Sequence, residues 1–383
     1  MSNDQVLNKA RTKHDAGKFE EAIQLYQMYL IKNPMHLDAN YLLGTAYAEM
    51  GKLEAAKKYL LKADKIMPYS PYVKVNLGNI YREQGDYESA LISFIRALEI
   101  QSDFAEARQN IGIVIGMMEE GSSEKAATSC LGYALSCLWA GRNDEALSIL
   151  VVGNHLDPQN AHIRYFMTIL DGNQPEKALL EEFVQQEFDT IAPIYDTTLK
   201  ENFNYSAPSQ LVGMLKNIRG NDMHFDSIAD LGCGTGLVGE AFKGHFGSIT
   251  GIDLSEKMLE TAKTKGVYDH LIRGEIVAEL GRINRNFDLF VAADVFIYIG
   301  ELDHLFEAVI ARSNPGALLV FTTESGDGDS VALKPTGRYV HGREYISAVT
   351  QKHGCSIIDS RQIQLRKEGE NWIMGDAFCV KVA

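Results

Sequence analysis

The sequence predicts an all-helical repeat domain followed by an α/β domain with a mostly parallel, seven-stranded sheet. The first observation is a 34-residue spacing of glycines and alanines in the first third of the chain. The second is an alternation of short apolar runs with amphipathic stretches after residue 220, which is typical of βαβ units. The third is a glycine-rich turn, residues 230–236, between a predicted strand and a predicted helix. We therefore expect a repeat domain over residues 1–180 and an α/β domain over residues 181–383.

Composition limits the classes of protein to which the chain can belong. It has 383 residues, of which 45% are hydrophobic and 23% charged, as in soluble globular proteins of two or three domains. No apolar run could span a membrane and the first residues lack a signal-peptide core, so we expect a cytoplasmic protein. The net charge of −14 makes nucleic acid a poor partner. Five widely spread cysteines without CxxC pairs argue against disulfides and a metal site, and favour buried thiols.

Three sets of small residues recur at 34-residue intervals: Gly17, Gly51 and Gly85; Ala22, Ala56 and Ala90; and Gly44, Gly78 and Gly112. Small residues let two antiparallel helices approach closely, and a glycine permits the tight turn between them. The pattern resembles the tetratricopeptide repeat, in which hairpins stack because none can bury its apolar face alone. The resemblance implies a groove for a protein or peptide. The alternatives are repeats that only form a homodimer and a generic helical solenoid.

The repeat register slips once. Ala134 follows Gly112 by only 22 residues, so we expect the unit between them to be shortened or irregular. Residues 161–187 are expected to form one further degenerate hairpin or cap, broken near residues 171–175.

The α/β domain is predicted from its alternating elements. Strands are expected at residues 227–231, 248–252, 270–276, 287–292 and 317–323, and near 356–366 and 372–382. Helices are expected at residues 237–243, 255–266, 302–312 and 342–353.

The glycine-rich turn carries the chemistry of this domain. It contains Asp230, Gly232, Gly234 and Gly236, and Asp253 ends the next predicted strand. Glycines let the backbone approach a ligand at the strand ends, and Asp253 is placed to accept hydrogen bonds from two ribose hydroxyls. A dinucleotide-binding fold is the alternative, because residues 234–239 satisfy GxGxxG, a weak signal by itself. The acid before the first glycine and the two final strands disfavour NAD.

The segments DLGCGTG and GIDLSEKML together resemble the class I S-adenosylmethionine-dependent methyltransferases, whose core is Rossmann-like. The resemblance implies that S-adenosylmethionine is the cofactor. It also implies a role for each matching residue: Gly232, Gly234 and Gly236 under the methionine moiety, Asp230 near its amino group, Asp253 at the ribose, Leu254 and Met258 beside the adenine, Glu275 at the adenine amino group, and Ala293 on the methionine side.

The segment before the first strand carries a second resemblance. Phe188-Asp189 and Tyr195-Asp196 resemble a motif that precedes the core of several small-molecule methyltransferases and supplies a lid over the cofactor. Residues 181–220 are therefore expected to form the lid, with Tyr195 at the cofactor; plain helix packing is the alternative. Together with the repeats, the chain resembles predicted bacterial methyltransferases that bear tetratricopeptide repeats.

Methyl transfer is an in-line displacement at a sulfonium carbon, so the protein must mainly align a nucleophile and exclude water. A general base is needed only if the nucleophile arrives protonated. Asp294, Tyr298 and His341 are the candidates. Each has a structural alternative. Asp294 would only bond loop amides, Tyr298 would pack in the core, and His341 would lie at the surface.

Motifs that the sequence lacks narrow the class of methyl acceptor. No Asn-Pro-Pro or Asp-Pro-Pro follows the fourth predicted strand and no Pro-Cys occurs, which disfavours base-amine, glutamine and cytosine-C5 acceptors and leaves proteins and small molecules. We consider three functions: a methyltransferase whose repeats recruit a protein acceptor or carrier, a metabolite methyltransferase whose repeats only dimerise, and a scaffold without catalysis. The complete set of glycines with Asp253 argues against the third.

Overall fold

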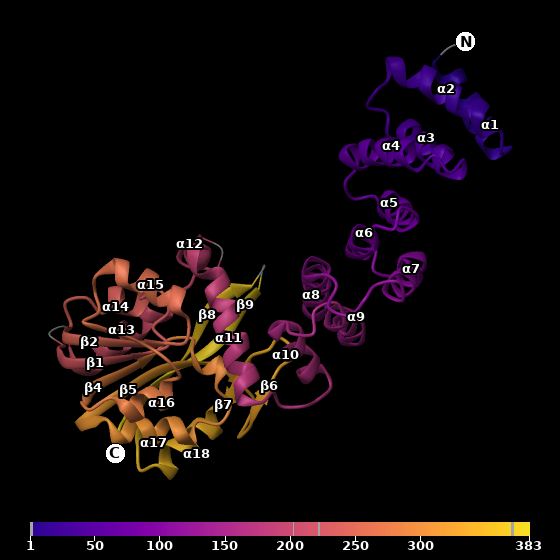
Figure 1. Cartoon of the computed structure of the whole chain (residues 1–383). Coiled ribbons are helices and arrows are strands. Elements are labelled where there is room, and N and C mark those ends of the chain that lie inside the picture. Colours follow the sequence, from indigo (N-terminus) through magenta and orange to yellow (C-terminus); the bar gives the residue numbers. More distant parts are fainter. Residues whose placement is uncertain (1–2, 202, 221–222, 369–370) are drawn as a thin grey trace. The chain divides into compact units, whose positions relative to one another are not determined.

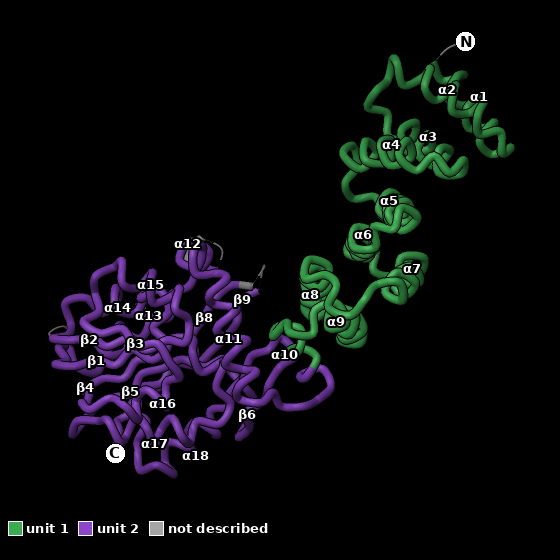
Figure 2. The backbone as a smooth tube through the Cα atoms, viewed as in Figure 1, with its two compact units in different colours: residues 1–167 green, residues 168–383 purple. Residues whose placement is uncertain are grey.

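The computed structural model describes residues 3–201, 203–220, 223–368 and 371–383, and the chain forms two compact units (Figures 1 and 2). Unit 1 spans Met1–Met167 and unit 2 spans Thr168–Ala383. The boundary expected at residue 180 falls inside helix α11 (Lys177–Ile191) of unit 2.

Unit 1 is all-helical. Its helices are α1 (Asn3–Asp15), α2 (Phe19–Lys32), α3 (Leu37–Glu49), α4 (Leu53–Ile66), α5 (Pro71–Glu83), α6 (Tyr87–Ile100), α7 (Ala105–Ile115), α8 (Glu124–Trp139) and α9 (Asn143–Leu156), while α10 (Ala161–Leu170) runs across the unit boundary. Helix α1 packs against α2, α3 against α4, α5 against α6 and α8 against α9. The predicted series of helical hairpins is therefore confirmed.

The small residues of the repeat lie where the two helices of a hairpin approach each other. A Cβ added at Gly78 would lie 2.5 Å from the ring of Phe94, so only glycine fits between α5 and α6. A Cβ at the equivalent Gly112 would meet nothing within 4 Å. Helix α7, which carries Gly112, packs against α6, and α6 packs in turn against α8. The hairpin is therefore lost in this unit, as the slipped register predicted.

Gly51 makes the turn between α3 and α4 with a φ of +66°, in the left-handed region. We expect Gly51→Val to lower the free energy of unfolding of the repeat unit by about 1–3 kcal/mol, because a β-branched residue is strained at this φ. Gly51→Asn is the matched control, since asparagine tolerates the left-handed region. Calorimetry of the full chain measures both. Equal melting of the two variants and the wild type would show that the turn is not strained by the substitution.

Unit 2 contains one sheet, which has nine strands among the described residues: β1 (Phe225–Leu231), β2 (Phe246–Asp253), β3 (His270–Arg273), β4 (Phe287–Ala292), β5 (Ser313–Gly326), β6 (Val331–Leu333), β7 (Tyr339–Gly342), β8 (Ser356–Glu368) and β9 (Asn371–Lys381). Five are parallel in the order β3-β2-β1-β4-β5. β9 is antiparallel to β5, and β8 to β9. This is the predicted seven-stranded plan. The sequence missed β6 and β7 because each is only three or four residues long.

The β6–β7 hairpin (residues 331–342) pairs with the edge of β5 that faces away from β9. Glu324 of β5 pairs with Gly375 of β9 and with Val340 of β7, so β9 and β7 lie on opposite edges of β5. β4 also pairs with β5 opposite β9. β7 therefore continues the edge that β4 occupies, beyond the carboxyl end of β4.

Helices cover both faces of the sheet (Figure 1). Besides α11, unit 2 has η1 (Ala192–Ile194), α12 (Tyr195–Glu201), α13 (Ala207–Arg219), α14 (Leu237–Ala241), α15 (Glu256–Lys265), α16 (Ile276–Arg282), η2 (Phe296–Tyr298), α17 (Asp303–Ala311) and α18 (Arg343–Lys352). Alternate residues of β4 enter two apolar cores: Leu289 and Val291 pack with α13 and α14, and Phe290 and Ala292 pack with α16, α17 and α18.

Two other expectations are settled by the fold. Residues 161–187 do not form the single degenerate hairpin or cap that was expected: α10 runs across the unit boundary, and α11 packs against α15 of the α/β unit. All five cysteines are buried and unpaired, as expected. In the described ranges, no helix combines the length and apolarity that crossing a membrane requires.

Candidate active site

A cavity of about 300 Å³ opens at the carboxyl ends of the parallel strands of unit 2. Its walls come from the loops after β1, β2, β3 and β4 and from helix α11. Carboxyl ends of parallel strands are where open α/β sheets bind ligands. Ten residues predicted at the site line it: Gly232, Gly234, Asp253, Leu254, Glu275, Ala293, Asp294, Tyr298, Tyr195 and Phe188.

The glycine loop holds its backbone close to the cavity. The amides of Gly232 and Cys233 donate to the carbonyl of Ile252, at 2.8 and 3.0 Å, which ties the loop to β2. Gly232, Gly234 and Gly236 all have positive φ values. A Cβ at Gly234 would meet no protein atom within 4 Å, so a side chain there would enter the open space of the cavity. Gly236 lies outside the lining and begins helix α14.

Asp253 connects the end of β2 to the glycine loop. Its carboxylate accepts from the amide of Gly234 at 2.8 Å and from the amide of Ser255 at 2.9 Å. Burial raises the pKa of Asp253, and the two amide hydrogen bonds oppose that shift. Each carboxylate oxygen has a second lone pair that a ligand hydroxyl can use. Met258, expected beside the adenine, is buried outside the lining.

Asp230 is fully buried at the end of β1 and does not line the cavity. One of its oxygens accepts from the Tyr268 hydroxyl at 2.6 Å, and the other oxygen has no hydrogen-bond partner among the residues that the structure describes. Burial raises the pKa of Asp230 to about 7, against the Tyr268 hydrogen bond that lowers it. Tyr268 also accepts from the amide of Gly239 at 3.1 Å, so it joins Asp230 to α14. The sequence did not reveal Tyr268, because no local pattern marks a contact 38 residues away.

Aromatic rings and two aspartates hold the predicted lid segment over the cavity. The ring of Phe188 packs edge-on against Tyr195 and Tyr298, with centroids 5.9 and 5.6 Å away. The hydroxyl of Ser255 donates to Asp189 at 2.6 Å, and that of Thr235 donates to Asp196. The two aspartates of the lid motif therefore fasten it to the start of α15 and to the glycine loop.

Glu275 lines the cavity where α16 begins. Its carboxylate accepts from the amides of Val277 and Ala278, at 3.1 and 3.0 Å, and caps this helix. Lys177 of the lid helix lies 3.2 Å from the same carboxylate.

Asp294 lines the cavity after β4 with a φ of +61°. Both of its oxygens accept from Nη1 of Arg366, at 3.0 and 2.9 Å, and Nη2 of Arg366 donates to Glu324. Arg366 is 4% exposed and comes from β8, so the sequence order gave no signal for it. The Arg366 guanidinium therefore holds both oxygens of Asp294 in a largely buried ion pair.

His341 does not lie where the sequence prediction needs it. It is 1% exposed, outside the lining, with Nε2 3.0 Å from the carbonyl oxygens of both Ile299 and Gly300. Burial lowers the pKa of His341, so the ring is neutral and its Nε2–H donates to these carbonyls. Its assignment as a general base is wrong, because β7 buries the ring behind the cavity wall.

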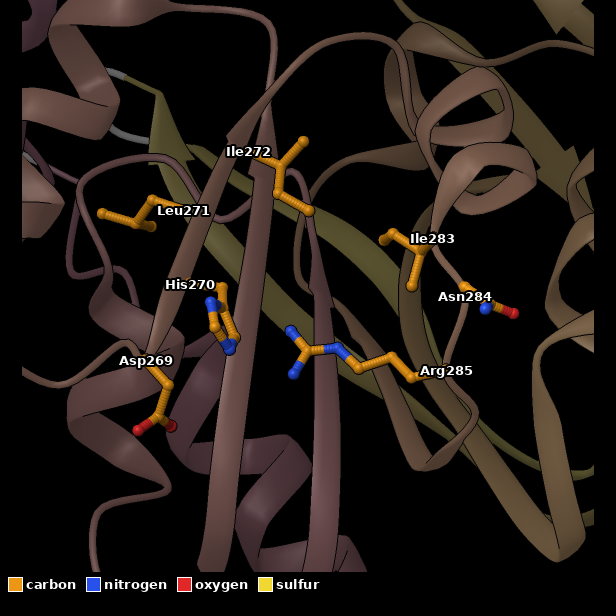
Figure 3. Close-up of a pocket in the computed structure, with 7 residues that line it drawn as sticks. All are labelled: Asp269, His270, Leu271, Ile272, Ile283, Asn284 and Arg285. Carbon is orange, nitrogen blue, oxygen red and sulfur yellow. The ribbon is translucent and has the colours of Figure 1, made fainter.

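A second hollow, of about 560 Å³, lies at the amino ends of β3 and β4, where Arg285 and His270 are drawn (Figure 3). Its polar side chains serve the fold: Asp269 accepts from the amide of Ile249 at 2.8 Å, and Arg285 donates to the hydroxyl of Thr250. None of the predicted site residues lines it.

Comparisons with known proteins agree with this division of the chain. Residues 228–316 match a family model described as a methyltransferase domain, and residues 13–74 and 78–118 match models of the tetratricopeptide repeat. The ubiquinone biosynthesis O-methyltransferase of Coxiella burnetii is 26% identical over 99 residues, which cover 25% of this chain and 42% of the relative. The malonyl-[acyl-carrier protein] O-methyltransferase of Priestia megaterium is 29% identical over 148 residues, 37% of this chain and 52% of the relative.

The chain thus spans about half, or less, of the length of these curated relatives. An S-adenosylmethionine-dependent methyltransferase structure from Clostridium acetobutylicum aligns with a TM-score of 0.40 at 22% identity, over 51% of this chain and 99% of that one.

The strand order, the glycine loop and the matched domains define the class. The chain combines tetratricopeptide repeats with a methyltransferase domain, and the strand order of that domain is class I and Rossmann-like. S-adenosylmethionine is the cofactor of this class of domain. The residues fit it: a Cβ at Gly234 would enter the cavity, the carboxylate of Asp253 lines it, and one buried oxygen of Asp230 has no partner within the described part of the chain.

Proposed function

We propose that this protein transfers a methyl group from S-adenosylmethionine to an acceptor that is a protein or is carried by one, and that the repeats recruit that protein. The observation that carries the proposal is the cavity in which Gly234 and Asp253 are joined at the strand ends. In this proposal Asp253 holds the ribose, Glu275 and Leu254 meet the adenine, and Gly232 and Gly234 lie under the methionine moiety. The unpartnered oxygen of Asp230 supports its role near the amino group.

The cofactor supplies an electrophilic methyl group, and the side chains must hold the nucleophile and exclude water. Phe188, Tyr195 and Tyr298 form an apolar cover over the cavity. Burial raises the pKa of both tyrosines, so in this proposal their hydroxyls stay protonated and are available as hydrogen-bond donors rather than as bases. Arg366 engages both oxygens of Asp294, and in this proposal the nucleophile needs no base from the protein.

Recruitment by the repeats is supported by exposed apolar side chains in unit 1. Ile31, Met35, Tyr69 and Trp139 are 80%, 70%, 82% and 75% exposed. Contiguous apolar patches mark contact surfaces for other proteins, and this proposal takes these side chains to belong to such surfaces. The relative from Priestia megaterium is named for an acceptor borne by a carrier protein, which also supports a protein-bound acceptor.

The test is transfer of a labelled methyl group in a host extract by the full chain. We expect the label on a protein, and we expect an excess of the full-length Asp253→Ala variant to suppress labelling, because it retains the repeats. Label that appears only on free metabolites, unaffected by this competitor, would contradict recruitment and favour the alternative in which the repeats only dimerise.

A further inference from the structure

The β6–β7 hairpin is not required by the seven-stranded plan, yet it reaches two walls of the cavity. It extends the sheet beyond β4, where the loop Ala293–Glu301 begins to line the cavity. Its residues 338–341 contact groups from three other segments of unit 2.

The first wall is the loop that contains Ile299 and Gly300, both of which line the cavity. The neutral His341 ring donates to the carbonyl oxygens of both residues, at 3.0 Å each. The ring of Tyr339 packs so closely that a Cβ at Gly300 would lie 2.8 Å from it. Backbone carbonyls held by a buried side chain cannot shift without leaving the donor unsatisfied.

The second wall is the lid helix α11. The hydroxyl of Tyr339 donates to the side-chain oxygen of Gln174 at 3.0 Å. Gln174 lies three residues before Lys177, which is the first residue of α11 and lines the cavity. The far end of the lid is fastened by Asp189 and Asp196, as described above, so Tyr339 fastens the near end.

The third contact is a chain of charged side chains that ends at Asp294, which lines the cavity. Arg338 lies 3.8 Å from Glu324, and Glu324 accepts from Arg366, which binds Asp294. One short hairpin therefore contacts the loop after β4, the base of the lid and the charged group that holds Asp294.

We propose that the β6–β7 hairpin fixes the spacing between the lid helix and the loop at Ile299–Gly300, and so governs entry to the cavity, with Tyr339 and His341 as positioning residues. This inference rests on the proposed function, because it takes this cavity to be the one that cofactor and acceptor enter. Loosening either contact lets the lid base separate more often from the loop. Entry and exit of a ligand then become faster together, since opening precedes both.

The experiment measures association and dissociation rate constants of S-adenosylhomocysteine with the full chain by stopped flow. Tyr339→Phe removes the hydroxyl that bonds Gln174 and keeps the ring against Gly300. We expect both rate constants to rise about fivefold, as for the loss of one hydrogen bond, with Kd changed less than about twofold. His341→Leu should do the same, and His341→Gln, whose amide can donate to the same carbonyls, should restore wild-type rates.

Two results would overturn the inference. One is a rise in the dissociation rate alone, with a matching loss of affinity, since this means that the hairpin only supports the bound ligand. The other is no change in either rate constant. If the wild-type chain does not bind S-adenosylhomocysteine at all, the proposed function fails. Hydrogen exchange of the free full chain then still tests the spacing: His341→Leu must speed exchange at residues 171–176 as well as at 299–302, and a change confined to 299–302 contradicts it.

Discussion

Substitution of Gly234 by valine is expected to abolish binding of S-adenosylmethionine in isothermal titration. Gly234 lines the cavity with a φ of +51°, and a Cβ there meets no protein atom. The isopropyl group therefore occupies space that the ligand needs, and it also strains the backbone by about 1–3 kcal/mol. The amide of Gly234, which orders the Asp253 carboxylate, is displaced by the same strain.

Gly244→Val is the control that separates occupation of the ligand space from backbone strain. Gly244 also has a positive φ, +84°, and open space around its Cβ, but it is exposed and lies outside the cavity lining. We expect this control to lose similar stability in thermal unfolding and to bind the cofactor as the wild type does. If Gly234→Val binds normally, or if Gly244→Val loses binding equally, the glycine loop is not the ligand wall.

Replacement of Asp253 by alanine is expected to weaken cofactor affinity at least about tenfold, because charge-assisted hydrogen bonds to the ribose hydroxyls are lost. Asp253→Asn is the matched control, since it keeps one acceptor oxygen, which can accept from the amide of Gly234 or from that of Ser255 but not from both as the carboxylate does. Its affinity should lie between those of the wild type and Asp253→Ala. Equal affinity of all three proteins would place the ribose elsewhere.

Asp253 also gives the binding a pH dependence. Burial raises the pKa of this carboxyl above its ordinary value, and the ionised form, which accepts both ribose hydrogen bonds, is present above that pKa. Affinity of the wild type should therefore fall as the pH is lowered through this raised pKa. The Asp253→Asn variant should lack this component, because it has no proton to bind there.

The sequence predicted the parts of the site that local pattern encodes. Gly232, Gly234 and Asp253 were found because a strand, a glycine turn and an acid at the next strand end are close together in the chain. The repeat hairpins were found for a similar reason, since the period of 34 residues repeats the same local packing.

The residues that the sequence missed act over long distances in the chain. Arg366 meets Asp294 across 72 residues, and Tyr268 meets Asp230 across 38. His341 was misassigned because the short strands of the β6–β7 hairpin give no strand signal, and the hairpin is what buries it. Helix α11 was divided between two domains, because an apolar stripe shows that a helix packs but not what it packs against.

The central claim is tested most directly by a crystal structure of the full chain with S-adenosylmethionine. The account predicts the ribose hydroxyls within hydrogen-bond distance of the Asp253 carboxylate and the methionine portion against Gly232 and Gly234. A nucleoside found in the hollow lined by His270 and Arg285, or crystals that take up none at saturating concentration, would contradict it.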